Sequence, residues 1–278
     1  MVDVTGIAAA VGLTGHLTEP LLSVRGVVMR FGGVVALAGV SFDVAPNQIC
    51  GLIGPNGSGK TTLFNVVSGF CRPLLGDILV RGQPIGALAR HRRASLGIGR
   101  TFQSLALFRS MSVRDNILVG AYPLGRSGFF AHALALPRVR REAREAEALL
   151  ADVLALLDLG PVADLPAGAL PFGTAKRVEI ARALMARPLL LLLDEPACGL
   201  NHTEVEALVD LLRRIHARSA VTLLLVEHHM GLVMRLCGHV VVLAAGAKIA
   251  DGTPEQVRRE PDVIRAYLGA APDSADAA

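Results

Sequence analysis

The chain has 278 residues, of which 52% are hydrophobic, and its 28 lysines and arginines outnumber its 24 aspartates and glutamates by four. This length is enough for a large domain with its own buried core. The mean hydropathy of +0.48 is high, but the apolar residues are dispersed, and the longest leucine run, residues 189–193, holds only five. A bilayer crossing needs roughly 20 apolar residues in succession, so we expect any link to a membrane to go through partner proteins.

The N-terminus and the aromatic content bear on location and partners. The first basic residue is Arg25, so the chain lacks the charged start of a secretory signal, and we expect it to stay in the cytosol. The net charge of +4 leaves nucleic acid open as a partner. With no Trp and two Tyr, however, the chain has few rings on which bases can stack. We therefore expect no nucleic-acid partner.

The N-terminal part of the chain predicts strands. Residues 1–20 show no sustained periodicity, and we interpret them as a flexible leader. Short apolar runs bounded by Gly, Pro and Asn follow at residues 23–29, 34–44 and 49–53. The third run ends at a glycine-rich loop, after which the pattern predicts a helix over residues 62–69.

The middle of the chain has a different pattern. Between about residues 105 and 180, Ala- and Arg-rich helical periodicity over residues 138–157 replaces the strand pattern, and we interpret this stretch as an inserted helical subdomain. Its arginines alternate with glutamates, which indicates ordinary surface ion pairs. The preceding run RHRR at residues 90–93 is interpreted as a solvated basic face, because it is short and lacks aromatic residues, with contact to RNA or lipid as the alternative.

Further strands follow in the C-terminal half. Apolar runs at residues 189–193, 221–226 and 240–243 are continuous rather than alternating, as expected of strands buried on both faces. A helix with one apolar face is predicted over residues 204–218. This alternation of strands and helices favours an α/β fold with an open, mostly parallel sheet.

The end of the chain predicts a helical tail. Thr253 and Gln256 form a capping-box pattern, with Pro254 at the first helical position. We therefore divide the chain, after its leader, into a main domain at residues 21–252, which holds the helical subdomain, and a tail at residues 253–278.

The strongest chemical signal is the sequence GPNGSGKT at residues 54–61, which has the spacing G-x-x-x-x-G-K-[ST]. Glycines allow successive backbone N–H groups to face one point, and the N-terminus of the next helix adds positive potential. The motif predicts a phosphate cradle in which Lys60 reaches the outer phosphates and Thr61 is a ligand of Mg²⁺. A glycine-rich turn without a ligand is the alternative, and the strand before the loop and the helix after it disfavour that alternative.

Two carboxylates form the second signal. Asp194 and Glu195 follow a buried strand directly, at the sheet edge where α/β folds bind ligands. We expect Asp194 to hold Mg²⁺, directly or through water, and Glu195 to polarise the attacking water as a general base. A solvated strand end is the alternative, which is weak because adjacent charges after five leucines need a partner or solvent.

With these motifs in this order, the chain resembles the ATPase subunits of ATP-binding cassette (ABC) transporters over residues 21–269. The resemblance implies a P-loop NTPase (RecA-like) core with a mostly parallel sheet, an N-terminal antiparallel β part and an inserted α-helical subdomain. It also implies roles for three further residues: Gln103, in the sequence RTFQ, as a sensor of Mg²⁺ and of the membrane partner, His228 as a contact of the γ-phosphate, and Phe31 as a stacking partner of adenine.

The complete set of expected site residues follows from the motifs and the resemblance together. The catalytic residues are Lys60, Gln103, Glu195 and His228. The metal ligands are Thr61, Gln103 and Asp194. The nucleotide-binding residues are Phe31, Gly54, Asn56, Gly57, Ser58, Gly59, Lys60, Thr61, Thr62 and Gly173. ATP and Mg²⁺ are the expected cofactors.

The sequence departs from the family at three places. The signature, commonly LSGGQ, is LPFGT at residues 170–174, before a helix expected over residues 175–187. Pro171 supplies neither a hydroxyl nor a backbone N–H, so only later amides and the helix dipole are left for the phosphate held by a partner subunit. His229 replaces an acidic residue, and we interpret it as a surface or loop histidine rather than a metal ligand. Cys198 stands at a position where the family usually has a small residue.

Within the family, the sequence resembles the ATPases of branched-chain amino-acid importers, on residues 30–33, residues 194–201 and the tail from residue 252 to AYLG at 266–269. The resemblance implies an ATP-hydrolysing energy-coupling subunit on the cytoplasmic side of the membrane. Its implied partners are a second ATPase subunit, identical or related, transmembrane permease subunits and, indirectly, a substrate-binding protein. Urea import, lipopolysaccharide export and a weakly hydrolysing, nucleotide-gated regulatory cassette are the alternatives.

Overall fold

The computed structural model describes residues 19–101, 105–124 and 137–268. Its central sheet has six strands in the order β10-β9-β3-β8-β7-β6. In chain order, they are β3 Ile49–Ile53, β6 Ile98–Arg100, β7 Leu190–Asp194, β8 Thr222–Val226, β9 His239–Ala244 and β10 Ala247–Gly252. Strand β3 is parallel to β8 and β9, and β7 is parallel to β8 and β6, whereas β10 is antiparallel to β9. Every residue of β3, β7 and β8 is buried, which explains why their sequences are apolar except at strand ends.

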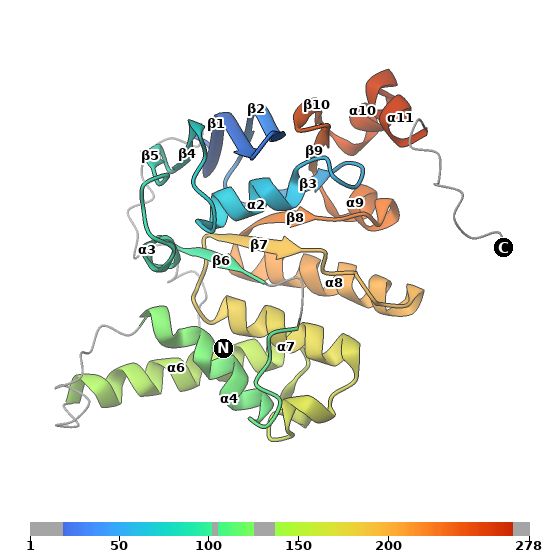
Figure 1. The fold of residues 1–278 in the computed structure, drawn as a ribbon. Coiled ribbons are helices and arrows are strands. Elements are labelled where there is room, and N and C mark those ends of the chain that lie inside the picture. The colour runs from blue at the N-terminus through green and yellow to red at the C-terminus, as the bar shows by residue number, and fades with distance from the viewer. Residues whose placement is uncertain (1–18, 102–104, 125–136, 269–278) are drawn as a thin grey trace.

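A second, antiparallel sheet lies above the central one in Figure 1 and has the order β2-β1-β4-β5. Its strands are β1 Leu22–Phe31, β2 Val34–Val44, β4 Leu75–Val80 and β5 Gln83–Pro84. Helix α2 (Lys60–Ser68) lies between the two sheets, where Leu63 and Phe64 join a core cluster with residues of both, such as Leu37 and Leu192. The two sheets thus enclose the helix that begins at Lys60.

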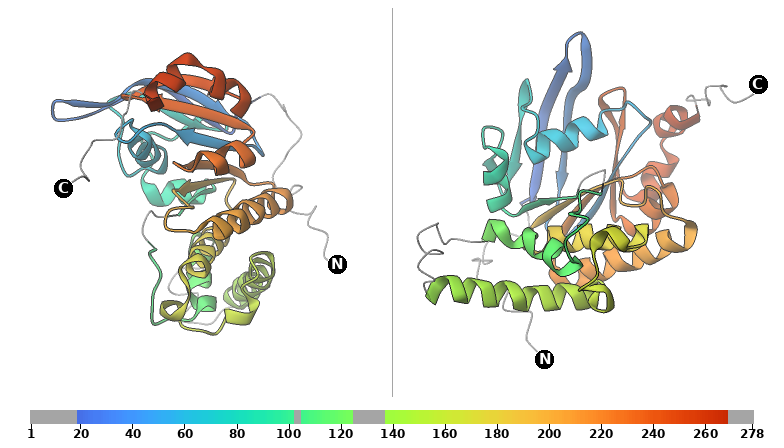
Figure 2. Two further views of the ribbon diagram at one scale, coloured as in Figure 1. Left: turned by 90° about the vertical axis from the view of Figure 1, so that its right-hand side faces the viewer. Right: turned by 60° about the horizontal axis from the view of Figure 1, so that its bottom comes forward.

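The remaining helices lie outside the layer formed by the two sheets and α2. They are α3 Arg90–Ser95, α4 Val113–Leu118, α6 Pro137–Leu156, α7 Phe172–Leu184, α8 His202–Ser219, α9 Met230–Leu236, α10 Pro254–Arg259 and α11 Pro261–Leu268, with short 3₁₀ turns η1 Val119–Leu124, η2 Gly160–Val162 and η3 Ala167–Ala169. Helices α4, α6 and α7 gather below the central sheet, far from β1 and β2 (Figures 1 and 2). The fold class is as predicted: a mostly parallel core, an antiparallel β part and an inserted helical part.

Most predicted elements are confirmed with small shifts at their ends. The helix predicted over residues 204–218 is α8, and its N-cap Asn201 forms a capping box with Glu204. The capping box of Thr253 and Gln256 is also present, at the start of α10. The helix expected over residues 175–187 differs, because α7 already begins at Phe172, with Pro171 as its N-cap.

The basic run at residues 90–93 is not simply a solvated face. Arg93 is only 2% exposed, and its guanidinium donates to the carbonyls of Val66 and Val67 at 2.6 and 2.8 Å. These carbonyls lie in the last turn of α2, where backbone acceptors lack partners within the helix. The prediction was wrong for this arginine because a charge run in the sequence does not reveal a helix end that needs donors.

Two further observations concern membrane-spanning helices and the predicted domain boundaries. In the part of the chain that the structure describes, no helix is both long and apolar enough to cross a bilayer. Most of the expected leader lies outside the described residues, and the domain boundaries at residues 20 and 252 stay predictions.

Candidate active site

The loop between β3 and α2 has a backbone shape that glycine makes possible. Gly54, Gly57 and Gly59 all have positive φ, at 150°, 75° and 100°. A Cβ on Gly54 would lie 2.0 Å from the carbonyl oxygen of Leu243, and one on Gly59 would lie 2.5 Å from that of Ala36. Neither position tolerates a side chain, so the curl of the loop depends on these residue types.

Lys60 fills the inside of this loop. It is 5% exposed, and its Nζ donates to the carbonyl oxygens of Gly54 and Pro55, both at 2.8 Å. Burial lowers the pKa of Lys60, and the charge of Glu195 partly opposes this. The ammonium group is therefore held within the predicted phosphate cradle and within electrostatic reach of the predicted general base. The other predicted nucleotide-binding residues of the cradle are in the same loop and in the first turn of α2: Asn56, Ser58, Thr61 and Thr62.

The parallel register of β7 and β8 brings two further predicted residues together. Asp194 pairs with Val226 across the sheet, and the backbone N–H of Glu195 donates to the Val226 carbonyl at 3.0 Å. Consequently the residues that follow the two strands are adjacent, and His228 Nε2 lies 2.7 Å from Glu195 Oε1. Glu195 has φ of 47°, a left-handed conformation that is uncommon for residues other than glycine and that tends to occur at functional sites.

Asp194 offers a carboxylate oxygen for a cation. It is 2% exposed, and its Oδ2 accepts a hydrogen bond from Arg100 Nη2 at 2.8 Å. Its Oδ1 is buried and has no hydrogen-bond partner within the described residues. An unpaired carboxylate oxygen and the exposed hydroxyl-bearing Thr61 are the hard oxygen donors that Mg²⁺ prefers, so the residues present fit this ion.

Glu227 has a structural role that the sequence analysis missed. Its buried carboxylate accepts hydrogen bonds from the backbone N–H of Ala197 at 2.7 Å, His228 at 3.1 Å and His229 at 3.3 Å. Burial raises the pKa of Glu227, although these three hydrogen bonds partly oppose the rise. The residue thus joins the loops that follow β7 and β8. Its position directly after an apolar run, like that of Asp194, is the signal that could have identified it.

Some predicted residues lie elsewhere. Phe31 stands beside the turn of the β1–β2 hairpin, which projects from the molecule in Figure 2, and it is 51% exposed. Its stacking on adenine stays a prediction. Gly173 lies in the first turn of α7, where a Cβ would be 2.8 Å from Glu204 Oε1 in α8, and not in the phosphate loop. Gln103 lies outside the described residues. His229 is the N-cap of α9, since its Nδ1 accepts from the Leu232 N–H at 3.2 Å.

The C-terminal elements contact the phosphate loop from the other side. The N–H of Gly246, in the β9–β10 turn, donates to the Ser58 carbonyl at 3.2 Å. Burial raises the pKa of Tyr267 in α11, and a hydrogen bond from the backbone of Gly54 to its hydroxyl lowers that pKa in part. The tail therefore contacts the phosphate loop, although the two are more than 200 residues apart in the sequence.

Comparison with known proteins identifies the family. The family model described as "ABC transporter" matches residues 37–198, which is more than half of the chain. The chain belongs to the ABC transporter family. A second model, described as "Branched-chain amino acid ATP-binding cassette transporter", matches the C-terminal part of this ABC protein, residues 247–273.

Individual relatives of this ABC protein agree with the match. It is 45% identical to the high-affinity branched-chain amino acid transport ATP-binding protein BraF of Pseudomonas aeruginosa and 44% identical to LivG of Escherichia coli K12, in each case over 92% of this chain and the whole relative. Among solved structures, the ADP conformation of the ATP-binding cassette MJ1267 has a TM-score of 0.77 and 30% identity, over 91% of this chain and all of that one. The ABC protein is thus an ATPase with the predicted P-loop NTPase fold.

Proposed function

We propose that this ATPase hydrolyses ATP with Mg²⁺ to drive the import of branched-chain amino acids. Relatives named for branched-chain amino acid transport match almost the full chain, and the model of the same description matches its tail. Membrane permease subunits are the partners that such an ATP-binding subunit requires. A second ATPase subunit and a place at the cytoplasmic face of the membrane belong to the same proposal.

Each group near the phosphate loop has a distinct task in this reaction. The loop amides and Lys60 bind the phosphates, with the helix N-terminus of α2 adding positive potential. Thr61 and Asp194 Oδ1 would hold Mg²⁺, and the bound ion would neutralise negative charge on the phosphates. Glu195 accepts the proton of the attacking water, and His228 fixes the direction of that carboxylate through the 2.7 Å contact.

The observation that carries the proposal is the position of the Glu195–His228 pair next to a buried lysine in a glycine-built loop. Glu195 is only 16% exposed, while His228 is 43% exposed. A general base that is largely buried but lies next to a solvent-exposed residue can reach a water molecule and still keep its orientation. Such an arrangement suits hydrolysis of the terminal phosphoanhydride bond of ATP, because the attacking water is positioned before its proton is transferred.

The position of α7 supports the need for a second subunit. Its first turn, with Gly173, packs beside the start of α8, and the Phe172 ring lies about 3 Å from where a Cβ on Gly199 would be. The phosphate loop lies on the opposite side of β7, next to α2 (Figure 1). This position supports the proposal that Gly173 contacts a phosphate bound by another copy of this chain or by a related subunit.

The proposal is tested by Glu195→Gln in the purified chain. Loss of a positioned base is expected to slow ATP turnover by about 10² to 10⁴ while ATP binding, measured by calorimetry, is retained. Glu255→Gln, an exposed change of the same type on α10, is the matched control and should leave turnover unchanged. Unchanged turnover in Glu195→Gln would remove this residue from the role of base, and a wild type without affinity for ATP would overturn the proposed function.

The transported substrate is tested with the permease present. Proteoliposomes that hold the complete transporter should take up leucine, isoleucine and valine in an ATP-dependent manner, and not urea. Uptake of urea alone would assign the subunit to another importer without affecting its ATPase activity.

A further inference from the structure

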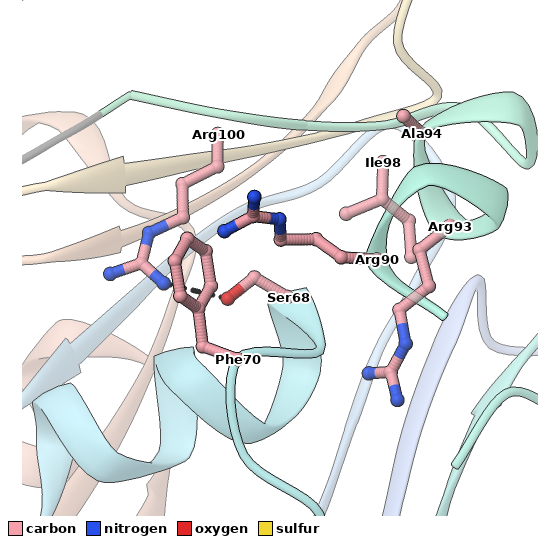
Figure 3. Close-up of a pocket in the computed structure, with 7 residues that line it drawn as sticks. All are labelled: Ser68, Phe70, Arg90, Arg93, Ala94, Ile98 and Arg100. Atoms are coloured by element: carbon pink, nitrogen blue, oxygen red, sulfur yellow. Dashed lines mark hydrogen bonds between the residues drawn. The ribbon is translucent and has the colours of Figure 1, made fainter. Parts of the chain in front are cut away.

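Arg100 is held on several sides at the end of β6. Its side chain is 13% exposed, and its Nη2 donates to Asp194 Oδ2 at 2.8 Å. Its Nη1 donates to Asn65 Oδ1 at 2.8 Å and to Ser68 Oγ at 2.6 Å, the contact drawn in Figure 3. One guanidinium therefore connects the end of β7 with the last two turns of α2.

Aromatic rings fix the plane of this guanidinium. Its central carbon lies 5.0 Å from the centroid of the Phe70 ring and 5.7 Å from that of Phe64. Figure 3 shows the Phe70 ring between Arg100 and Arg90, at the edge of a pocket of about 210 Å³. A planar cation that stacks on rings and makes a fork of hydrogen bonds has little freedom to rotate.

The unpaired atoms lie in the same pair of residues. Across residues 19–101, 105–124 and 137–268, the buried side-chain nitrogen and oxygen atoms that lack a hydrogen-bond partner are Arg100 Nε and Asp194 Oδ1. Because Oδ2 is committed to Arg100, Oδ1 is the oxygen that remains for another ligand. Buried polar atoms are otherwise almost always paired, so an exception next to a phosphate-binding loop marks a place for a ligand.

We propose that Arg100 is a positioning residue that orients the Asp194 carboxylate, so that Oδ1 is presented to Mg²⁺. The inference rests on the proposed function, in which Asp194 holds this ion. Arg100 also connects the carboxylate to α2, whose first turn carries Lys60 and Thr61. The distance between the metal-binding carboxylate and these phosphate-binding residues is thereby kept constant. Loss of a residue that orients a metal ligand typically costs about 10- to 100-fold in metal affinity.

The test measures how strongly Mg²⁺ improves the binding of ADP, a nucleotide that the protein does not hydrolyse. Calorimetry gives the Kd of ADP in the presence of EDTA and in the presence of Mg²⁺, for the full chain. In Arg100→Gln, we expect the Kd in EDTA to stay within about twofold of the wild type, while the improvement by Mg²⁺ falls about tenfold. A purely structural role would weaken binding in both conditions equally.

Arg90→Gln is the matched control. Arg90 also lies over the Phe70 ring, with its guanidinium carbon at 4.4 Å from the centroid, but on the opposite side of the ring from Arg100 (Figure 3). Its removal should leave the effect of Mg²⁺ unchanged. Equal losses in both variants would overturn the proposal, because they would show a general effect of positive charge.

Two further outcomes keep the test decisive. An unchanged effect of Mg²⁺ in Arg100→Gln would overturn the proposal, since it would mean that Arg100 does not act on the metal ligand. A stronger effect would overturn it too, since it would mean that Arg100 only repels the ion. Should this variant fail to fold in a thermal melt, Ser68→Ala replaces it, and loss of one acceptor should lower the effect of Mg²⁺ by about threefold. No change in Ser68→Ala would then overturn the proposal. A wild type that does not bind ADP contradicts the proposed function instead.

Discussion

Buried carboxylates at the ends of two neighbouring strands are stabilised in different ways. Asp194 has a charged partner, Arg100, whereas Glu227 accepts hydrogen bonds from three backbone N–H groups. Charge-assisted hydrogen bonds offset part of the cost of burying each carboxylate. The two carboxylates therefore differ in what they hold: one faces a cation and the other joins two loops.

The shifted pKa of Glu227 has a consequence for stability. Burial raises this pKa, so the folded protein keeps the proton to higher pH than the unfolded chain. The stability that the group contributes is complete below about pH 4, the ordinary range for Glu, and is lost as the pH rises through the folded-state pKa. Glu206 behaves in the opposite way, because its hydrogen bond to Arg235 lowers its pKa and its contribution is lost as the pH falls.

We therefore expect the free energy of unfolding of the wild type, relative to Glu227→Gln, to decrease from about pH 4 to about pH 7. Relative to Glu206→Gln, it should instead decrease as the pH falls below about 4, because this carboxylate then becomes protonated. Urea denaturation at a series of pH values measures both differences. Parallel trends for the two variants would show that the raised pKa of Glu227 does not contribute to stability.

At the scale of elements, the two capping boxes differ in what their helices support. Helix α8 has 18 residues, and its Val205, Leu208 and Leu212 belong to the larger core cluster below the central sheet. Helix α10 has six residues near the end of the chain and buries Pro254 and Val257. A cap on α8 therefore acts on the cooperative core, while a cap on α10 acts mainly on the tail.

Asn201→Ala should lower the free energy of unfolding by about 1 kcal/mol, the usual cost of losing an N-cap, because the start of α8 cannot loosen without disturbing the core. Thr253→Ala is the matched comparison and should change global unfolding less. Urea denaturation followed by circular dichroism measures both. Equal effects of the two substitutions would mean that the tail unfolds together with the core.

At the scale of the whole molecule, the start of α7 belongs to the surface where we propose that a second subunit binds. Pro171 is the N-cap of α7, with φ of −57° and ψ of 150°, and it offers neither a side-chain acceptor nor a backbone N–H. The amides of the first turn of α7 and the positive end of its dipole are left to contact a phosphate. The sequence LPFGT thus retains the helix terminus of the signature and lacks the donors of its serine.

Pro171→Ser restores a hydroxyl and an N–H at this position. Ser is a good N-cap and tolerates the observed backbone angles, so α7 should gain stability, and ATP turnover of the assembled transporter should stay unchanged or rise. Pro261→Ser, at the start of α11, is the matched control and should not alter turnover. A clear loss of activity in Pro171→Ser alone would show that the proline itself is required.

Local patterns in the sequence determined much of the fold and of the phosphate site. Strands β3, β7 and β8 have apolar interiors with polar residues only at strand ends, because burial on both faces disfavours polar side chains. The loop at residues 54–61 was recognisable because its backbone angles require glycine at fixed spacing. Asp194 and Glu195 were recognisable because carboxylates directly after a buried strand need a partner.

Only the tertiary structure decided which distant groups meet. Arg100 pairs with Asp194 across 94 positions of the chain, and Glu227 reaches Ala197 across 30. These contacts follow from the strand order β3-β8-β7-β6. No local periodicity encodes this order, because the sequence of a strand shows that the strand is buried but does not show which strands lie next to it. For the same reason, the sequence presented Arg93 as one of a solvated run, whereas the fold places it against the carbonyls that end α2.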